Sequence, residues 1–323
     1  DHALFSDGQI GHFGHPLLLK FFARCKDAGM FELRGDDMRL GLFFAEMGNE
    51  SNHRAFQGEI VALCRARSEN DFYRFAAKKV RRGGADVVVR INRPLSLAVR
   101  DLEHSICPDV DAIACTKVDS ASHVRLLDEV VTEREEKRGM TIGHTRFITM
   151  IETADAFFRI HEIVRASERI VATCIGGEDF ALDCNMQPTG EALFYPKQHM
   201  IIAANSVGIM PLGFIDSIAG FGDWDKFRKM VRRSRDFGFM GAGCIHPGQV
   251  TIVNEEYTPT AEEVEFARKV VKLDKEAAAT GRGSWSLDGK MIDIPVVVRA
   301  QKLIKRFAAI KAREATTLAA MKD

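Results

Sequence analysis

Phe147-Ile148-Thr149-Met150-Ile151-Glu152 is a run of mostly apolar residues that ends in a carboxylate. A second run, Ile170-Val171-Ala172-Thr173-Cys174-Ile175, continues into Gly176-Gly177-Glu178-Asp179. Apolar side chains at nearly every position predict strands that are covered on both faces, and therefore a parallel sheet. Barrel enzymes keep their chemistry at the C-terminal ends of such strands, so Glu152 and Asp179 are expected on one functional rim.

The same pattern repeats along the chain from residue 85 onward. The apolar runs start about 25 to 35 residues apart, which is the length of a strand–helix unit, and amphipathic stretches separate them. The runs cover residues 87–91, 112–118, 147–151, 170–175, 208–215 and 243–245. The polar residues that close them are Arg90, Lys117, Glu152, Asp179, Asp216 and His246. An open doubly wound sheet would place ligands across fewer strands, so the pattern favours a closed (β/α)8 barrel, a TIM barrel.

A barrel of eight strands requires two more strands from residues 1–84. The candidates are residues 3–5, 30–33 and 40–44. We expect the catalytic barrel to span residues 1–255. Residues 256–323 are expected to form a C-terminal helical extension, which serves as a lid or as an arm between subunits.

The extension contains two helix signals. Thr260 is followed by acidic residues, which is typical of a helix N-cap, and this helix is expected to end near Ala279. A second helix is expected to follow Pro295.

Composition excludes several classes of protein. Lys+Arg and Asp+Glu both number 45, so the net charge is zero and a nucleic-acid binder is not expected. No apolar run approaches the roughly 18 to 20 residues of a membrane helix, and no signal peptide is visible. The seven cysteines show neither a CxxC pair nor zinc-ligand spacing. We therefore expect reduced thiols and a cytoplasmic protein.

Two interpretations are open for Glu152 and Asp179. As a pair on successive strands they can hold Mg²⁺ or Mn²⁺ through their oxygens, with water and substrate completing the coordination. As ordinary strand-end acids they would form surface salt bridges. The Gly176-Gly177-Glu178-Asp179 turn is likewise either a plain loop or a turn whose backbone N–H groups bind a substrate carboxylate.

Four further residues are candidates. Arg90 ends an apolar strand, where a guanidinium either clamps an oxyanion or carboxylate or pairs with an acid of the rim. Lys117 should stay charged beside carboxylates, which favours a role in orienting the substrate over a Schiff base. His246 precedes proline, which is more typical of a hydrogen-bonded cap than of a base. Asp293, taken alone, is more typical of a structural acid.

Several motifs occur in a fixed order between residues 85 and 305. They are Val87-Val88-Val89-Arg90-Ile91-Asn92, Thr116-Lys117-Val118-Asp119, Met150-Ile151-Glu152-Thr153, Gly176-Gly177-Glu178-Asp179-Phe180, Ile245-His246-Pro247-Gly248-Gln249-Val250 and Gly289-Lys290-Met291-Ile292-Asp293-Ile294-Pro295. Together they resemble the motifs of the citrate lyase beta-subunit-like family, within the HpcH/HpaI aldolase superfamily. One departure is Asn185, where the family has a glycine that Asn can replace in a left-handed conformation.

This resemblance implies a (β/α)8 barrel with a C-terminal helical extension, assembled as a homotrimer or hexamer. It also implies a Mg²⁺-dependent lyase that cleaves or forms carbon–carbon bonds in a short β-hydroxyacyl-CoA, such as malyl-, citramalyl- or citryl-CoA. Three other functions remain open: a pyruvate-type class II aldolase acting on a free 2-oxo acid, a malyl-CoA thioesterase, and a barrel without catalysis that serves as a scaffold.

The resemblance also implies roles for the site residues. Glu152 and Asp179 would ligate Mg²⁺, and Arg90 would stabilise the oxyanion. Backbone groups of Gly176, Gly177 and Glu178 would bind the substrate carboxylate. Asp293 would reach the active site of a neighbouring subunit and exchange the proton at the acetyl carbon.

Overall fold

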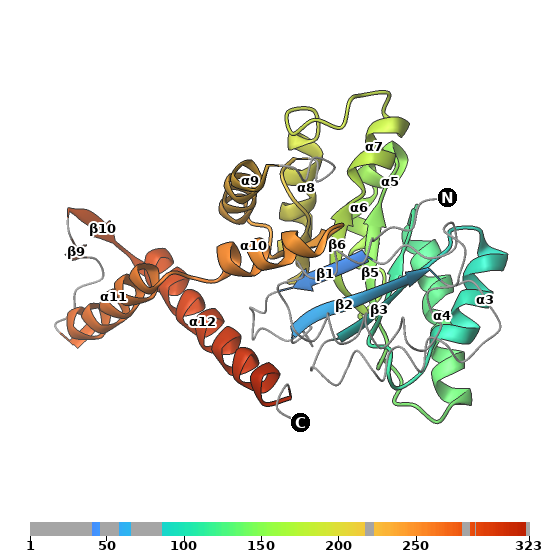
Figure 1. The fold of residues 1–323 in the computed structure, drawn as a ribbon, viewed down its shortest axis with the longest axis horizontal. Coiled ribbons are helices and arrows are strands. Elements are labelled where there is room, and N and C mark those ends of the chain that lie inside the picture. Colours follow the sequence, from blue (N-terminus) through green and yellow to red (C-terminus); the bar gives the residue numbers. More distant parts are fainter. Residues whose placement is uncertain are drawn as a thin grey trace, which may run out of the picture.

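A computed structural model describes residues 41–45, 58–65, 86–216, 223–279, 285–287 and 289–320 of the chain. Its centre is a closed barrel with the strand order β1-β2-β3-β4-β5-β6-β7-β8 (Figure 1). The strands are β1 (Gly41–Ala45), β2 (Gly58–Arg65), β3 (Asp86–Ile91), β4 (Ala112–Cys115), β5 (Arg146–Ile151), β6 (Ile170–Ile175), β7 (Met210–Leu212) and β8 (Gly241–Cys244). Neighbours from β2 to β8 are parallel, whereas β1 runs antiparallel to both β2 and β8. The predicted α/β barrel is confirmed, with one strand reversed.

The two N-terminal strands differ in how far the sequence predicts them. The candidate at residues 40–44 corresponds to β1, while those at residues 3–5 and 30–33 lie outside the described residues. Strand β2 contains the apolar run Ile60-Val61-Ala62-Leu63-Cys64, which is typical of a buried strand but is not among the predicted strands. Two other strands are shorter than predicted, because the chain turns at Lys117 and Gly213, which have φ values of 47° and 140°.

Helices cover the outside of the barrel (Figure 1). They are α3 (Leu95–Ser105), α4 (Ala121–Lys137), α5 (Ala154–Phe158), α6 (Ile160–Ile163), α7 (Gly177–Asp183), α8 (Phe194–Asn205), α9 (Trp224–Phe237) and α10 (Pro247–Tyr257). Side-chain caps fix where four of them begin, because Ser120, Thr153, Asp223 and His246 each accept a hydrogen bond from a backbone N–H of the first turn. None of the helices among the described residues is long and apolar enough to cross a bilayer.

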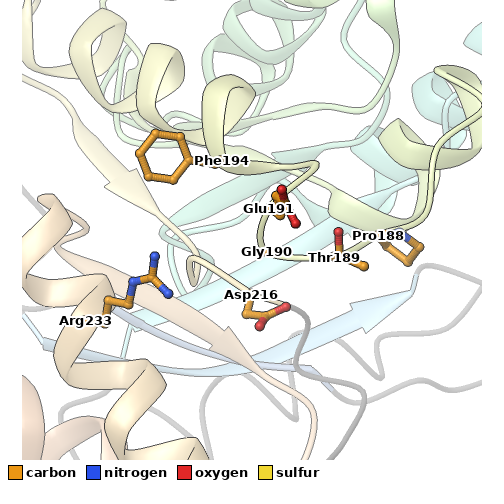
Figure 2. A pocket seen from close by; sticks show the side chains of 7 residues that line it. All are labelled: Pro188, Thr189, Gly190, Glu191, Phe194, Asp216 and Arg233. Carbon is orange, nitrogen blue, oxygen red and sulfur yellow. The ribbon is translucent and has the colours of Figure 1, made fainter.

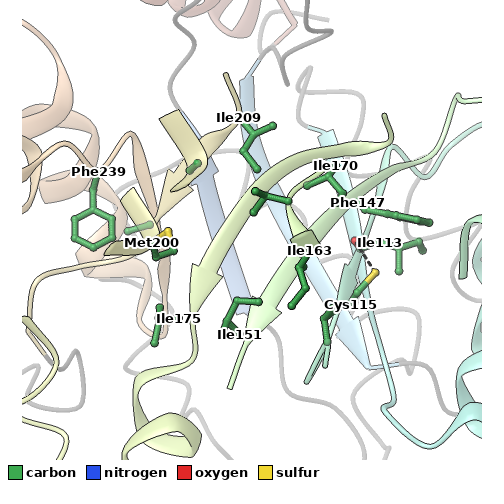
Figure 3. Packing of buried hydrophobic residues seen from close by; sticks show 14 of the residues in the cluster. Ile113, Cys115, Phe147, Ile151, Ile163, Ile170, Ile175, Met200, Ile209 and Phe239 are labelled. Carbon is green, nitrogen blue, oxygen red and sulfur yellow. Dashed lines mark hydrogen bonds between the residues drawn. The ribbon is translucent and has the colours of Figure 1, made fainter. Parts of the chain in front are cut away.

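Both faces of strands β3 to β8 are mostly buried, as the apolar runs predict. One cluster, which includes Val88, Ile148 and Leu212, is formed by alternate strand residues. The other strand face packs on the helices, where Phe147, Ile151 and their neighbours form a larger cluster (Figure 3). Alternate side chains of a strand point to opposite faces, so a strand buried on both faces must be apolar throughout.

The C-terminal segment packs around a small core of its own. It consists of α11 (Ala261–Ala279), a hairpin of β9 (Trp285–Leu287) and β10 (Lys290–Ile292), and α12 (Ile294–Ala320), and it projects from the barrel (Figure 1). Thr260 caps α11 as predicted: its hydroxyl accepts from the Glu263 N–H, and the Glu263 carboxylate accepts from the Thr260 N–H.

A buried ion pair joins Arg169, the residue before β6, to α4. The Arg169 guanidinium donates to both carboxylate oxygens of Glu135, at 2.8 and 3.0 Å, and the side chains are 5% and 0% exposed. Burial acts to raise the pKa of Glu135, but Arg169 and the N–H groups of Gly143 and Thr145 outweigh it and hold the pKa below its usual value. The carboxylate is therefore charged and satisfied at neutral pH.

Replacing Arg169 by Met is expected to destabilise the fold by about 3 to 5 kcal/mol, because it leaves a buried charge without its partner. A depressed native pKa stabilises the fold above the unfolded pKa of 4.5, so the loss should shrink as pH falls below that value. Urea unfolding of the unmodified protein and the variant at several pH values measures this loss of stability. Arg159→Met, which breaks an exposed pair with Asp155, is the control and should cost under about 1 kcal/mol. Equal losses for the two variants would contradict this account.

Candidate active site

Glu152 and Asp179 meet at the C-terminal ends of adjacent strands. Glu152 is the residue after β5, and Asp179 lies in the first turn of α7, which follows β6. Because β5 and β6 pair in parallel, the two side chains come into direct contact. Glu152 is 2% exposed, whereas the Asp179 side chain is 40% exposed. One carboxylate therefore lies at the bottom of the site and the other at its opening.

The electrostatics of the pair fit a divalent cation. Burial raises the pKa of Glu152, the Lys117 N–H and Arg90 lower it, and Asp179 raises it again, so the pKa lies above the usual value. A cation bound by both carboxylates would offset the cost of burying the charged Glu152 and the repulsion between Glu152 and Asp179. Among the described residues, no group of three or more His, Cys, Asp and Glu side chains forms a metal site. Two carboxylates with water and substrate match the way proteins usually bind Mg²⁺.

Lys117 contacts both carboxylates. It lies two residues after β4, in a left-handed conformation. Its backbone N–H donates to Glu152 Oε2 at 2.6 Å, and its Nζ donates to Asp179 Oδ1 at 2.8 Å. The hydrogen bond with Asp179 raises the pKa of Lys117 and lowers the pKa of Asp179. The ammonium is thus charged at neutral pH, which a Schiff-base nucleophile would not be.

Arg90 brings a second positive charge to the rim. It lies on β3 and is half-buried, and its charge lowers the pKa of both Glu152 and Asp179. Cys174 lies close to Glu152 and Arg90, but burial raises the pKa of its thiol to about 12, so it is not a nucleophile.

The diglycine turn, residues 176–179, is held between the site and α8. A Cβ on Gly176 would lie 2.6 Å from Glu152 Cγ, and a Cβ on Gly177 would lie 3.0 Å from Leu193 Cδ1. A side chain at either position would crowd its neighbour, so both positions favour glycine. The Gly176 N–H donates to the Ile151 carbonyl at 3.0 Å, so a bound carboxylate would take its N–H donors from Gly177 onward.

Two predicted residues lie outside this group. His246 caps α10, because its Nδ1 accepts from the Gly248 N–H at 3.0 Å. Asp293 lies between β10 and α12, where its Oδ1 accepts from the Val296 N–H at 3.3 Å. Figure 1 shows β10 and α12 well away from α5 and α7. A single chain therefore does not bring Asp293 to Glu152.

Motif reasoning missed Lys197, a buried lysine of α8. Its neighbours at positions 200, 201 and 204 are buried and apolar, so helical periodicity already places it on the apolar face of α8. Its closest charges are Glu178 and Asp216. Asp216 also faces a pocket of about 700 Å³ between the segment before α8 and the side chain of Arg233 on α9 (Figure 2).

A closed α/β barrel with paired carboxylates and fixed cations at its strand ends defines a barrel enzyme with a candidate metal site. The HpcH/HpaI aldolase/citrate lyase family profile matches residues 71–247. Citrate lyase subunit beta of Leuconostoc mesenteroides subsp. cremoris is 30% identical over 233 residues, which is 71% of this chain and 76% of that protein. Citrate lyase subunit beta of Escherichia coli K12 is 32% identical over 224 residues, which is 68% of this chain and 74% of that protein. The L-malyl-CoA/beta-methylmalyl-CoA lyase of Cereibacter sphaeroides (strain ATCC 17025) is 30% identical over 234 residues, which is 66% of this chain and 72% of that protein.

Solved structures show the same fold. Protein CitE of Mycobacterium tuberculosis, in complex with magnesium, acetoacetate and coenzyme A, aligns with a TM-score of 0.55 at 24% identity, over 72% of this chain and 83% of that one. A citrate lyase of Burkholderia xenovorans LB400 aligns with a TM-score of 0.61 at 15% identity, over 77% and 84%. The chain belongs to the HpcH/HpaI aldolase/citrate lyase family, a family of carbon–carbon lyases.

Proposed function

We propose that the protein is a Mg²⁺-dependent lyase that cleaves or forms a short β-hydroxyacyl-CoA, such as malyl-, citramalyl- or citryl-CoA. The products of cleavage would be an acyl-CoA and an oxo acid. The carboxylate pair of Glu152 and Asp179, joined by Lys117, is the observation that carries the proposal. Relatives named as citrate lyase subunit beta and malyl-CoA lyase support the substrate class. The structure of the Mycobacterium tuberculosis protein contains magnesium and coenzyme A, which supports Mg²⁺ and a CoA thioester as the ligands proposed for this chain. We expect that Mn²⁺ can replace Mg²⁺.

The reaction requires an alkoxide, then an enolate, then a proton. Mg²⁺ bound by Glu152 and Asp179 would lower the cost of the alkoxide by acting as a Lewis acid. Arg90 holds a fixed positive charge at the rim, where it would stabilise negative charge that develops on oxygen. Lys117 holds the Asp179 carboxylate in place. The N–H groups of the diglycine turn from Gly177 onward would bind the carboxylate of the oxo acid.

We propose further that residues 1–255 form the catalytic barrel and residues 256–323 a lid for a neighbouring subunit of a homotrimer or hexamer. Met291 and Ile294, on either side of Asp293, are 69% and 72% exposed. An acid between two exposed apolar side chains fits a contact with another chain. We place the enzyme in the cytoplasm, because the cysteines between residues 86 and 279 of the described chain are free thiols.

Substrate assays on the full chain test this function. The protein with Mg²⁺ is given malyl-, citramalyl- and citryl-CoA, and separately free 4-hydroxy-2-oxo acids. We expect acetyl-CoA and an oxo acid from at least one thioester, with activity lost in EDTA and restored by Mg²⁺. Release of free CoA would instead show a thioesterase, and turnover of the free acids alone would show an aldolase. No turnover of any substrate, with or without metal, would rule out an enzyme of this kind.

A further inference from the structure

Lys197 has an environment that is unusual for a lysine. Its residue is 6% exposed, on the face of α8 that carries Met200 and Ile201 into the core. No described residue forms a hydrogen bond or a close ion pair with its ammonium, and its charge acts on Glu178 and Asp216 from a longer distance. Burying an ammonium is unfavourable unless opposite charges compensate it. A lysine kept here therefore requires an explanation other than packing.

The position of Lys197 relative to the diglycine turn supplies that explanation. A Cβ on Gly176 would point at Glu152, while a Cβ on Gly177 would point at Leu193 and lie 3.9 Å from Lys197 Nζ. Glu152 and Lys197 therefore contact the turn from opposite sides. Lys197 lies behind the turn, on the side of α8, and does not reach the carboxylate pair.

Two carboxylates from different elements attract the ammonium. Glu178 comes from α7 and directly precedes Asp179, and Asp216 comes from the segment after β7. Asp216 is itself held close to the segment before α8, because a Cβ on Gly190 would lie 3.0 Å from its Cγ. Burial lowers the pKa of Lys197 to about 8, while Asp216 and Glu178 act to raise it. The side chain is thus mainly charged at pH 7.

We propose that Lys197 is a positioning residue for the metal site. Its buried ammonium attracts Glu178 and Asp216 to the outer side of the diglycine turn, and so fixes Asp179 where it meets Glu152. The inference rests on the proposed function, because it assumes that this pair binds a divalent cation. It assigns Lys197 no contact with the metal or the substrate.

The sign of the effect separates this role from simple electrostatics. A positive charge near a cation site repels the cation, so its removal would tighten metal binding by Coulomb's law alone. If Lys197 fixes the turn, its removal takes away the attraction that it exerts on Glu178 and Asp216, and the turn moves. Metal binding should then weaken.

Mn²⁺ binding by the full chain, measured by electron paramagnetic resonance at pH 7, tests the proposal without a catalytic assay. Lys197→Met keeps the length of the side chain and should weaken Mn²⁺ binding about 10- to 100-fold, as is typical for residues that orient metal ligands. Lys197→Arg keeps the charge and should recover most of the affinity. Lys229→Met removes a charge from an exposed position of α9 and should change nothing. Circular dichroism checks that each variant is folded.

Lys197→Gln provides a second test in case Lys197→Met fails to fold. It also removes the positive charge and should weaken Mn²⁺ binding, whereas Coulomb's law alone would make binding tighter. Unchanged or tighter binding in a folded Lys197→Met, or in Lys197→Gln if only that variant folds, would overturn the positioning role while leaving the metal site intact. Failure of the unmodified protein to bind Mn²⁺ would overturn the metal assignment as well, so the two failures are distinguishable.

Discussion

Glu152→Gln and Asp179→Asn should each abolish metal-dependent lyase activity, with a loss of at least about 1000-fold. A bound metal supplies several kcal/mol of charge stabilisation in the transition state, and each 1.4 kcal/mol corresponds to a factor of ten in rate. Each substitution keeps the shape of the side chain and removes one of the two charges that would hold the cation. Assays over a range of Mg²⁺ concentrations, with Mn²⁺ binding measured in parallel, check the expectation.

The two variants should differ in stability. The pKa of Glu152 is raised by burial, so its charged form destabilises the metal-free protein at neutral pH, and this cost disappears as pH falls through the native pKa. Glu152→Gln removes the cost and should raise the melting temperature while activity is lost. Asp179→Asn breaks an exposed ion pair with Lys117 and should change stability little. A gain in stability together with a loss of function is the expected signature of a residue kept for chemistry.

Glu162→Gln is the matched control, because Glu162 is an exposed acid on α6. It should retain both activity and Mn²⁺ binding. Full activity in both Glu152→Gln and Asp179→Asn would mean that the metal, if one is used, binds elsewhere.

The positions of Glu152 and Asp179 on one rim could be predicted from the sequence, because they depend only on strand periodicity. An apolar run marks β5 and another marks β6, and the residue or short turn after each run must lie on the shared rim. Family motifs then separated a metal site from surface acids. The direction of β1 was not predictable in this way, because a short apolar run gives no information on which neighbours it pairs with or in which sense.

The contacts that complete the site depend on tertiary structure. Lys117 reaches Glu152 through its backbone only because the chain turns in a left-handed conformation there, which favours glycine and is not expected of lysine. Lys197 was visible as a charge on an apolar helix face, but its relation to Glu178 and Asp216 depends on how α8 packs. Periodicity shows which face is buried, and it cannot show which charges the buried face meets.

Asp293→Asn should lower turnover by about 100- to 10,000-fold, which is the range for loss of a general acid or base. Mn²⁺ binding should be unchanged, because Asp293 is proposed as a proton carrier and the variant leaves the carboxylates of Glu152 and Asp179 intact. Stability should be unchanged as well, because Asn is as good a helix N-cap as Asp, and Asp293 caps α12. Exchange of the acetyl protons of acetyl-CoA in D₂O, followed by NMR, should stop in this variant. Normal exchange would show that another group carries the proton.

Mixed oligomers test whether Asp293 acts on a neighbouring subunit. Glu152→Gln and Asp293→Asn chains, each inactive alone, are co-expressed with different tags and purified as mixed assemblies. If Asp293 acts between chains in a closed ring, an intact barrel meets an intact lid at roughly a third of the sites of a mixed trimer, and at roughly a quarter in a larger mixed ring. About the same fraction of the activity should return. A mixture of Glu152→Gln with Asp179→Asn is the control, because both changes inactivate the barrel and leave no intact combination. Activity that stays absent in the first mixture would contradict the shared lid and place Asp293 in the active site of its own chain. Only a lid shared between subunits can combine an intact Glu152 from one chain with an intact Asp293 from another.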